Sequence, residues 1–281
     1  MKTRFLNDVF PLSFCPTGMV PQKSDTPHIP ISPQEIAEQV NLVSQIGITS
    51  VHLHARNEDG SPAWERKNFE RTIELIKDKN PELVICVTTS GRTVSEFGKR
   101  SDVLEISGDL KPDMASLTPA SMNFAKTASV NSPEMVVRLA QKMQENGIKP
   151  EFEVFDTGMI NYSKYLIAKK IAEPPYVFNI LLGGIATAQA ELLELGLMVQ
   201  RLPENSVWLG AGIGSAQLPA NLMSLAAGGG VRVGLEDNIF LNSGSDSLAT
   251  NVDLIERVVN LAAGMGKSVM SPIDFRKTYL S

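Results

Sequence analysis

Residues 32–55 read SPQEIAEQVNLVSQIGITSVHLHA and combine an amphipathic helix with the strand that follows it. Ser32 is a good N-cap, and Glu35 stands three residues later, where its side chain completes a capping box. Apolar residues then recur at helical spacing, at Ile36, Val40, Val43 and Ile46. Gly47 ends the helix, and the apolar, β-branched run Ser50–Ala55 is typical of a buried strand.

The same alternation of strand and helix continues along the chain. A second capped helix is predicted within Asn131–Gly147. Eight strand–helix units favour an α/β fold, a (β/α)8 TIM barrel in which residues 1–281 form a single domain. A doubly wound open sheet is the alternative, but residues 14–18, FCPTG, lack its glycine-rich fingerprint. The expected strands are Phe5–Cys15, Ser50–Ala55, Leu83–Thr88, Met114–Leu117, Glu151–Phe155, Tyr176–Leu182, Ser206–Ala211 and Val231–Gly234.

Composition and charge restrict the classes of function. Hydrophobic residues make up 43% and charged residues 20%, which is ordinary for a soluble globular protein. The formal net charge of −5 argues against a general nucleic-acid or anionic-membrane binder. No apolar run reaches the ~18 residues of a membrane span. With two cysteines and no secretory signal pattern, we expect reduced thiols and a cytoplasmic location.

A long segment rich in proline and polar residues, 18–31, follows the first predicted strand. In a TIM barrel, the segments that follow the strands lie at the catalytic end. Loops of this length without secondary structure of their own are often functional. We therefore expect residues 18–31 to form a lid-like loop over the active site.

His52 and His54 are separated by one residue on the predicted strand Ser50–Ala55. Residues i and i+2 of a strand point to one face, so both imidazoles project into one space near the catalytic end of the barrel. Two imidazoles suit a zinc ion that also takes a carboxylate and keeps one position open. The structural alternative is a pair of core histidines that donate to carbonyl groups.

Glu236, which follows the strand Val231–Gly234, is the best candidate for the carboxylate ligand. In a closed barrel the eighth strand lies two strands from the second, so its end can reach the same ion. Strand alternation puts the side chains of Arg232 and Glu236 on the same inner face of the barrel. Asp237, just past the end of the strand, can also turn inward. The alternative for this segment is a surface-exposed acidic turn.

Further polar residues lie on or near the ends of other predicted strands. Glu151 and Glu153 are in phase with each other, and one of these carboxylates could hold Arg232 in place. Taken singly, each acid is more typical of a salt bridge at the barrel rim. Hydroxyl donors at the same mouth are Thr88, Thr89, Ser90, Ser116 and Thr118.

A His-x-His pair also occurs in metal hydrolases of the amidohydrolase type. Those enzymes carry the pair on the first strand and need further histidines on later strands. This chain has three histidines, and the third, His28, lies in the loop 18–31. The ligand set of that class is therefore missing.

Over essentially its whole length the sequence resembles the β-keto acid cleavage enzymes. The matching segments occur in one order, which makes the resemblance specific: 16–18, 30–36, 52–56, 111–117, 150–155, 211–214 and 231–238. The resemblance implies a TIM barrel whose zinc ion is bound by His52, His54 and Glu236. It also implies that a β-keto acid and acetyl-CoA give acetoacetate and a shortened acyl-CoA. Family members of this kind are homo-oligomers, commonly tetramers.

The resemblance also implies roles for other residues. Asp237, Arg232 and Glu153 are similar to the proton-abstracting network of the family. Thr88 stands where the best-known member has a serine, so the hydroxyl is kept. The predicted substrate contacts are Ser116, Ser90, Arg92 and Thr17.

Two positions depart from the family's best-known member. That member has a glutamate placed to meet the amine of its substrate, and this chain has Val20 there. Arg92, in contrast, stands one place beyond the family's glycine pair at the mouth. We therefore expect a substrate whose distal end is neutral or anionic. An exposed loop arginine, or a contact with a CoA phosphate, is the alternative for Arg92.

Two other classes of function remain open at this stage. One is a metal-dependent aldolase or lyase that does not use CoA. The other is a non-catalytic barrel that binds a metal or an acyl group. Assays with and without acetyl-CoA separate all three, because the co-substrate is implied by the resemblance alone.

Overall fold

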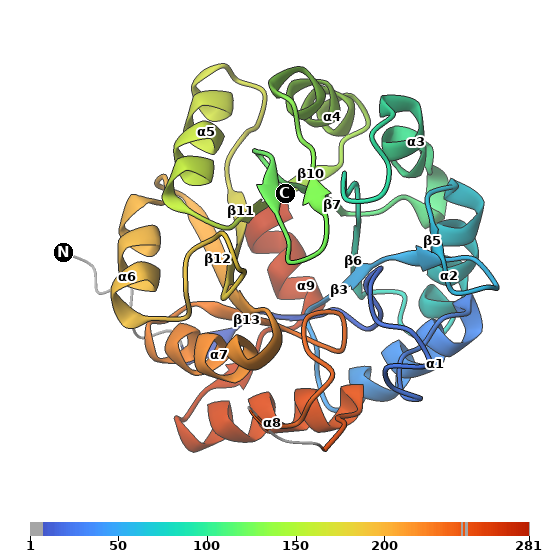
Figure 1. Cartoon of the computed structure of the whole chain (residues 1–281), viewed down its shortest axis with the longest axis vertical. Coiled ribbons are helices and arrows are strands. Elements are labelled where there is room, and N and C mark those ends of the chain that lie inside the picture. The colour runs from blue at the N-terminus through green and yellow to red at the C-terminus, as the bar shows by residue number, and fades with distance from the viewer. Residues whose placement is uncertain (1–7, 243, 245–246, 281) are drawn as a thin grey trace.

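The chain folds into a closed barrel of parallel strands surrounded by helices (Figure 1). The structure is a computed structural model, and it describes residues 8–242, 244 and 247–280. Around the barrel the strands follow the order β10 (Lys149–Val154), β11 (Tyr176–Leu182), β12 (Ser206–Gly212), β13 (Gly230–Val233), β2 (Leu12–Phe14), β3 (Ser50–Leu53), β6 (Val84–Val87) and β7 (Met114–Leu117).

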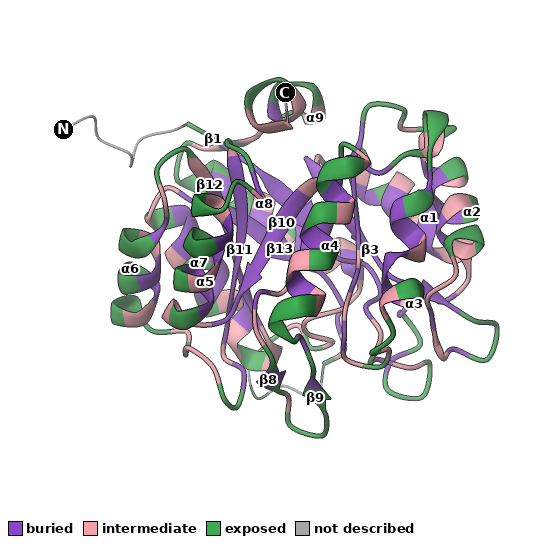
Figure 2. Ribbon diagram, turned by 90° about the horizontal axis from the view of Figure 1, so that it is seen from above, coloured by how far each residue is buried: buried purple, intermediate pink, exposed green. Residues whose placement is uncertain are grey.

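Helices cover the outside of this barrel. They bury one side against the strands and leave the other exposed, as Figure 2 shows. The capping box predicted for the first helix is present, because Glu35 N donates to Ser32 Oγ and Ser32 N donates to the Glu35 carboxylate. The helices are α1 (Pro33–Ser44), α2 (Arg66–Lys77), α3 (Phe97–Ser101), α4 (Pro133–Glu145), α5 (Thr157–Ala168), α6 (Leu192–Arg201), α7 (Gln217–Ala226), α8 (Asn251–Gly264) and α9 (Pro272–Phe275).

Closure of the barrel settles the fold class. The last barrel strand, β13, pairs with the first, β2, in parallel register, with Val231 opposite Leu12. β2 in turn pairs with β3. An open doubly wound sheet would leave two unpaired edges, so that alternative is wrong and the predicted TIM barrel is confirmed. The single-domain assignment over 1–281 stays a prediction, because both ends lie outside the described residues.

The first predicted strand, Phe5–Cys15, differs from the structure. It is divided at Pro11 into β1 (Val9–Phe10) and β2, and residues 5–7 lie outside the described part. Proline has no N–H to donate to a sheet, which favours a break there. β1 pairs with β14 (Ser268–Val269) outside the barrel.

The two ends of the barrel are built differently. At one end, α9 places the buried Phe275 against the strands, in a cluster with Val84, Cys86, Met114, Val177, Val207 and Leu209. At the other end lies the hairpin of β8 (Met122–Asn123) and β9 (Ala128–Ser129) (Figure 2). A second short hairpin, β4 (Ala55–Arg56) with β5 (Pro62–Ala63), follows β3 directly. Across the described residues, no helix combines the length and apolar character needed to cross a membrane.

Candidate metal centre and active site

His52 and His54 lie side by side at the carboxyl end of β3. His52 is on the strand, and His54 follows its last residue, Leu53. Their ring centroids are 5.2 Å apart, and both side chains are buried. The alternation of a strand has therefore placed both imidazoles in one space, as the sequence predicts.

Glu236 reaches the same place from the loop after β13. Its Oε1 lies 3.2 Å from His54 Nε2, and its side chain is only 13% exposed, which rules out a surface acidic turn. Ligand atoms of His52, His54 and Glu236 all lie within 4.8 Å of one another. The structure thus brings the three predicted metal ligands together.

Two buried atoms of this group have no hydrogen-bond partner among the described residues. They are His52 Nε2 and Glu236 Oε2. The nearest charged oxygen to His52 Nε2, Glu153 Oε1, is 3.9 Å away, beyond hydrogen-bond distance. Unsatisfied buried polar atoms are costly, and a shared cation would satisfy both.

The charge of the centre also calls for a cation. One guanidinium, that of Arg232, serves the carboxylates of Glu153, Glu236 and Asp237, and Glu151 lies nearby as a fourth acid. Two imidazoles and a carboxylate form a donor set that zinc accepts with an open position. The residues therefore fit a divalent metal ion.

Arg232 organises the acids. It is 1% exposed, its Nη1 donates to Glu153 Oε1 at 3.0 Å, and its Nη2 donates to Glu236 Oε1 at 2.6 Å. Its Nε donates to Asp237 Oδ2 at 3.0 Å. Burial alone would lower the pKa of Arg232, but the carboxylates of Asp237 and Glu236 outweigh it and raise that pKa. Likewise, burial would raise the pKa of Glu236, but Arg232 and His54 hold it well below its usual range.

Glu151 orients His52 from the opposite side of the barrel. Its Oε2 lies 3.2 Å from His52 Nδ1 and also accepts a hydrogen bond from Cys86 Sγ at 3.5 Å. A carboxylate on the far nitrogen of a metal-binding histidine fixes the ring and its tautomer. The sequence predicts only that Glu151 or Glu153 could hold Arg232. That Glu151 instead contacts a histidine is seen in the structure alone, although the two-residue spacing from Glu153 already indicates an inward side chain.

Cys86 could instead be read as a ligand, since His52, Cys86 and Glu151 form a second compact group. Metal-binding cysteine is a thiolate. Burial, followed by the charge of Glu151, raises the pKa of the Cys86 thiol well above its ordinary value. In the structure Cys86 Sγ donates to Glu151 Oε2, whereas His54 and Glu236 also line a cavity, so the group of His52, His54 and Glu236 is the better site.

Asp237 is held beside the metal group by two donors on one oxygen. Its Oδ2 accepts from Arg232 Nε and from Cys15 Sγ, the latter at 3.2 Å. Its Oδ1 accepts from Arg232 Nη2 at 3.2 Å. For Cys15 the sequence predicts a reduced thiol. Cys15 is buried, and its thiol also contacts the carboxylate of Asp237.

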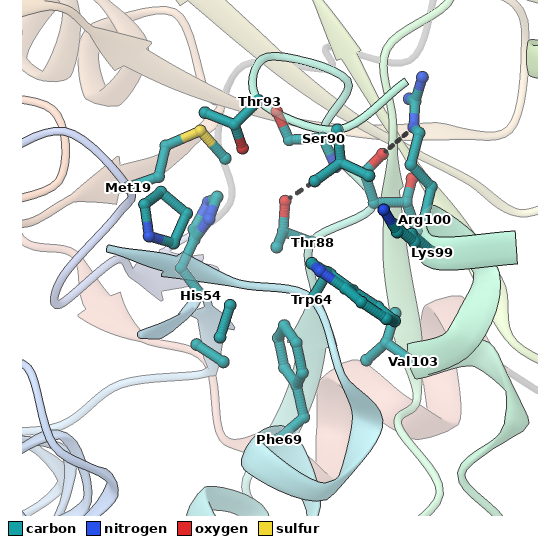
Figure 3. A pocket seen from close by; sticks show the side chains of 15 residues that line it. Met19, His54, Trp64, Phe69, Thr88, Ser90, Thr93, Lys99, Arg100 and Val103 are labelled. Atoms are coloured by element: carbon teal, nitrogen blue, oxygen red, sulfur yellow. Dashed lines mark hydrogen bonds between the residues drawn. The ribbon is translucent and has the colours of Figure 1, made fainter. Parts of the chain in front are cut away.

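The group opens into a cavity of about 500 Å3. Thr88, Ser90 and Arg92 line it, together with Val20, so these predicted residues face a common space. A small side pocket of about 30 Å3, enough to hold an ordered water molecule, adjoins it at His54 (Figure 3). Apolar side chains form much of its wall, among them Met19, Trp64, Phe69 and Val103.

Two predicted substrate contacts, Thr17 and Ser116, do not line this cavity. Both are buried, and both hydroxyls bind the chain itself. Thr17 Oγ1 donates to Pro30 O, which closes the base of the loop 18–31. Ser116 Oγ accepts from Thr89 N at 3.3 Å. The strand-end position predicts such hydroxyls near the mouth, but it does not say which of them the chain uses for itself.

The segment 18–31 is fixed to the barrel near the metal group. The buried guanidinium of Arg56 donates to the carbonyl oxygens of Gly18, Met19 and Pro21. Gly18 has a φ of +58°, and a Cβ there would lie 2.5 Å from Glu236 Cγ. Met19, Val20, Pro21 and Asp25 line the cavity. Whether the segment closes over a substrate stays a prediction.

Comparison with known proteins gives one consistent family. The family model described as beta-keto acid cleavage enzyme matches residues 11–280. A 3-keto-5-aminohexanoate cleavage enzyme of Fusobacterium nucleatum is 33% identical over 256 residues, which covers 91% of this chain and 92% of that protein. A 3-oxoadipate:acetyl-CoA acetyltransferase of Cupriavidus necator is 36% identical over 271 residues, with 94% and 92% covered.

Solved structures agree on the fold. A complex of ObcA with oxaloacetate superposes with a TM-score of 0.77 over 90% of this chain and 67% of that one, at 19% identity. Apo ObcA gives a TM-score of 0.76 at the same identity and with 65% of that chain covered. At this level of identity the likeness concerns the barrel alone.

Proposed function

The chain belongs to the β-keto acid cleavage enzyme family, and from this premise we propose that it converts a β-keto acid and acetyl-CoA into acetoacetate and a new acyl-CoA with the help of zinc. The observation that carries the proposal is the meeting of His52, His54 and Glu236 at the edge of a cavity that His54, Glu236 and Asp237 line. The relatives are named for different β-keto acids, so they support the reaction and leave the side chain of the substrate open. We propose a distal end that is neutral or anionic, because Val20 and Arg92 line the cavity.

In this proposal His52, His54 and Glu236 hold the metal, with Glu151 behind His52. A bound divalent cation acts as a Lewis acid toward the oxygens of the substrate and makes the neighbouring C–H more acidic. The chain's own residues then supply the proton acceptor and the groups that orient the substrate.

Asp237 is the proposed base. Its Oδ2 already accepts two hydrogen bonds, whereas Oδ1 accepts one and keeps a lone pair for a proton. It takes a proton from the carbon between the keto and carboxylate groups of the substrate. Arg232 keeps Asp237 in place while Glu153 holds the other end of the guanidinium, and Arg232 stabilises the negative charge that develops on oxygen.

The reaction that follows balances without a covalent enzyme intermediate. The substrate enolate attacks the carbonyl of acetyl-CoA, a C–C bond forms, and CoA leaves as its thiolate. The thiolate attacks the original keto carbon, and the bond between that carbon and the enolate carbon breaks. Acetoacetate takes back the proton held by Asp237, and the remainder of the substrate leaves as acyl-CoA.

Mass spectrometry of mixtures that contain the zinc-loaded protein, acetyl-CoA and a panel of β-keto acids tests the proposal. Acetoacetate and the matching acyl-CoA are expected from at least one keto acid. Cleavage without acetyl-CoA would favour the aldolase or lyase, and no product from any keto acid would favour a binding protein. Asp237→Asn should keep the metal and lower kcat by about 10²–10⁴-fold. Loss of zinc from this variant would show that the roles of Asp237 and Glu236 are wrongly divided.

We also propose that the protein works as a homotetramer in the cytoplasm and that residues 18–31 close over the bound substrate. Three exposed apolar side chains support an oligomer. Ile185, Leu192 and Leu193 are 74%, 78% and 81% exposed, on α6 and the loop before it. Large apolar side chains left this exposed are typical of a surface that another chain covers.

A further inference from the structure

Arg92 is a cation in the cavity wall without an acidic partner among the described residues. It is half-buried, and no carboxylate of the described chain lies within ion-pair distance of it. Arg232, on the same cavity, has three such partners. Burial lowers the pKa of Arg92. A guanidinium nevertheless stays charged in proteins. A half-buried charge without a partner calls for an anion from outside the chain.

Two residues of the β8–β9 hairpin hold the side chain of Arg92 in one position. Its guanidinium carbon lies 3.9 Å from the centroid of the Phe124 ring, and its Nε donates to Thr127 Oγ1 at 3.1 Å. Its backbone N donates to Ser90 Oγ at 3.3 Å. Phe124 and Thr127 both belong to the turn of the β8–β9 hairpin, and Phe124, Ala125 and Lys126 of this turn line the cavity. The orientation of the guanidinium is therefore fixed before any ligand binds.

The two terminal nitrogens of Arg92 have no acceptor in the part of the chain that the structure describes. A fixed guanidinium with both terminal nitrogens free matches a carboxylate, which accepts two parallel hydrogen bonds. Lys126 of the same hairpin lines the cavity and adds a second positive charge. Asp25 also lines the cavity, but its Oδ2 accepts from Gln22 N at 2.9 Å.

We infer that the substrate is a β-keto dicarboxylic acid whose second carboxylate binds Arg92 in a bidentate manner. The inference rests on the proposed function and narrows it from a neutral or anionic distal end to a carboxylate. The keto-acid end of this substrate lies at His52, His54 and Glu236, and the distal carboxylate lies at the β8–β9 hairpin. Val20, an apolar residue of the same cavity wall, offers nothing to a substrate ammonium group.

A phosphate of CoA could offer Arg92 the same chemistry as a carboxylate, so the experiment must separate the two. Initial rates are measured with a 3-oxo dicarboxylic acid and with the 3-oxo monocarboxylic acid of the same chain length. Both series vary acetyl-CoA as well as the keto acid. The variant is Arg92→Met, which keeps an apolar stem over Phe124 and removes the charge.

Arg138 provides a matched control. Its guanidinium carbon lies 4.0 Å from the Phe97 ring centroid, in the same arrangement, but it is on the outer helix α4 and pairs with Glu134. Arg138→Met therefore removes an equivalent arginine–phenylalanine contact outside the cavity. Any effect common to both variants reports on packing and not on substrate recognition.

We expect the wild type to prefer the diacid in kcat/KM by about 100-fold, the scale of removing one partner from a buried charge pair. Arg92→Met should lose this preference through a higher KM for the diacid, and Arg138→Met should keep it. The inference would be overturned if Arg92→Met lost the same factor in kcat/KM for the diacid and the monoacid. It would also be overturned if Arg92→Met raised the KM for acetyl-CoA with either acid. The second result would assign Arg92 to a CoA phosphate.

A binding measurement keeps this test apart from the proposed function. Calorimetry without acetyl-CoA compares binding of the diacid to the zinc-loaded wild type and to Arg92→Met. If no keto acid yields acetoacetate but Arg92→Met weakens diacid binding about 100-fold, the reaction is wrong and the carboxylate site stands. If the two proteins bind the diacid equally, the carboxylate site is refuted whatever the reaction proves to be.

Discussion

Among single residues, the proposed metal ligands could be predicted from the sequence, but the hydrogen bonds that hold the site together could not. His52, His54 and Glu236 were predicted from strand alternation and from the order of strands in a closed barrel, and they converge. The hydrogen bonds from Glu151 to His52 and from Cys15 to Asp237 were not predicted. Each of these contacts joins residues about a hundred or more positions apart, and no local pattern records such a pairing.

Replacing His52 should empty the metal site. His52→Ala removes one of the three proposed ligands, so the purified protein should carry less than a tenth of the wild-type zinc and form no detectable acetoacetate. Elemental analysis and the mass-spectrometric assay measure the two effects. His28→Ala is the control, because His28 is exposed and lies outside the cavity that the metal group lines. Full zinc content in His52→Ala would remove this residue from the ligand set.

Replacing Glu151 should weaken the metal site without destroying it. Glu151→Gln keeps the size of the side chain but offers His52 Nδ1 a weaker acceptor, so zinc affinity should fall about 10–100-fold. A competition titration with a chelator measures the affinity. Excess zinc should restore turnover, because the ligands themselves remain. Activity that stays lost at saturating zinc would mean that Glu151 does more than orient a ligand.

At the level of elements, strong local signals were enough for the long helices and strands. β7 and β11 have the bounds expected, and α1 begins at the predicted cap. The two-residue strands of the β4–β5 and β8–β9 hairpins were not predicted, because two residues are too few to show a period of two. The β8–β9 hairpin carries the contacts that hold Arg92, so this part of the cavity wall could not be predicted from the sequence either.

The capping box of α1 should make a pH-dependent contribution to stability. Burial works to raise the pKa of Glu35, but hydrogen bonds from Lys23 and from the backbone of Ser32 outweigh it and lower this pKa to about 2. A depressed pKa means that the charged form stabilises the fold above the unfolded value of 4.5, and that this contribution is lost as the pH falls toward 2.

Urea denaturation of Glu35→Gln and wild type tests this contribution. The variant should be less stable at pH 6, and the difference should shrink steadily below pH 4.5. Ser132→Ala is the control, since Ser132 caps α4 by its hydroxyl without a capping box. Ser132→Ala should lower the free energy of unfolding by about 1 kcal/mol at every pH. A Glu35→Gln difference that does not change with pH would show that the carboxylate charge is irrelevant to the cap.

On the scale of the whole molecule, barrel closure creates the site. Glu151 on β10 and His52 on β3 are separated by β6 and β7 in the sheet, yet their side chains meet inside the barrel. The sequence predicts the barrel from its alternating pattern, and the barrel then implies which strand ends gather at one mouth. The barrel pattern does not determine how far each inward side chain extends across the interior. The sequence therefore leaves open whether Glu151 or Glu153 pairs with Arg232, and the structure shows that Glu153 does.

The proposed oligomer gives a prediction at the same scale. Light scattering of the wild type should give four times the monomer mass. Leu193→Glu places a charge in the exposed apolar group of α6 and should lower the mass at micromolar concentration. Leu42→Glu is the control, at a position on α1 that is 47% exposed, and it should leave the mass unchanged. A monomeric wild type would end the proposal, and an unchanged mass for Leu193→Glu would place the contact elsewhere.

The contact between Gly18 and Glu236 sets a rule for anyone who redesigns this catalyst. Glu236, a proposed metal ligand, lies directly against a glycine of the first loop, so even the Cβ of an alanine there would push its side chain aside. Libraries aimed at new substrates should therefore leave position 18 untouched. They can draw their diversity from Val20 and Arg92, which line the cavity and are not among the proposed metal ligands. Selectivity and chemistry can thus be engineered separately in this scaffold.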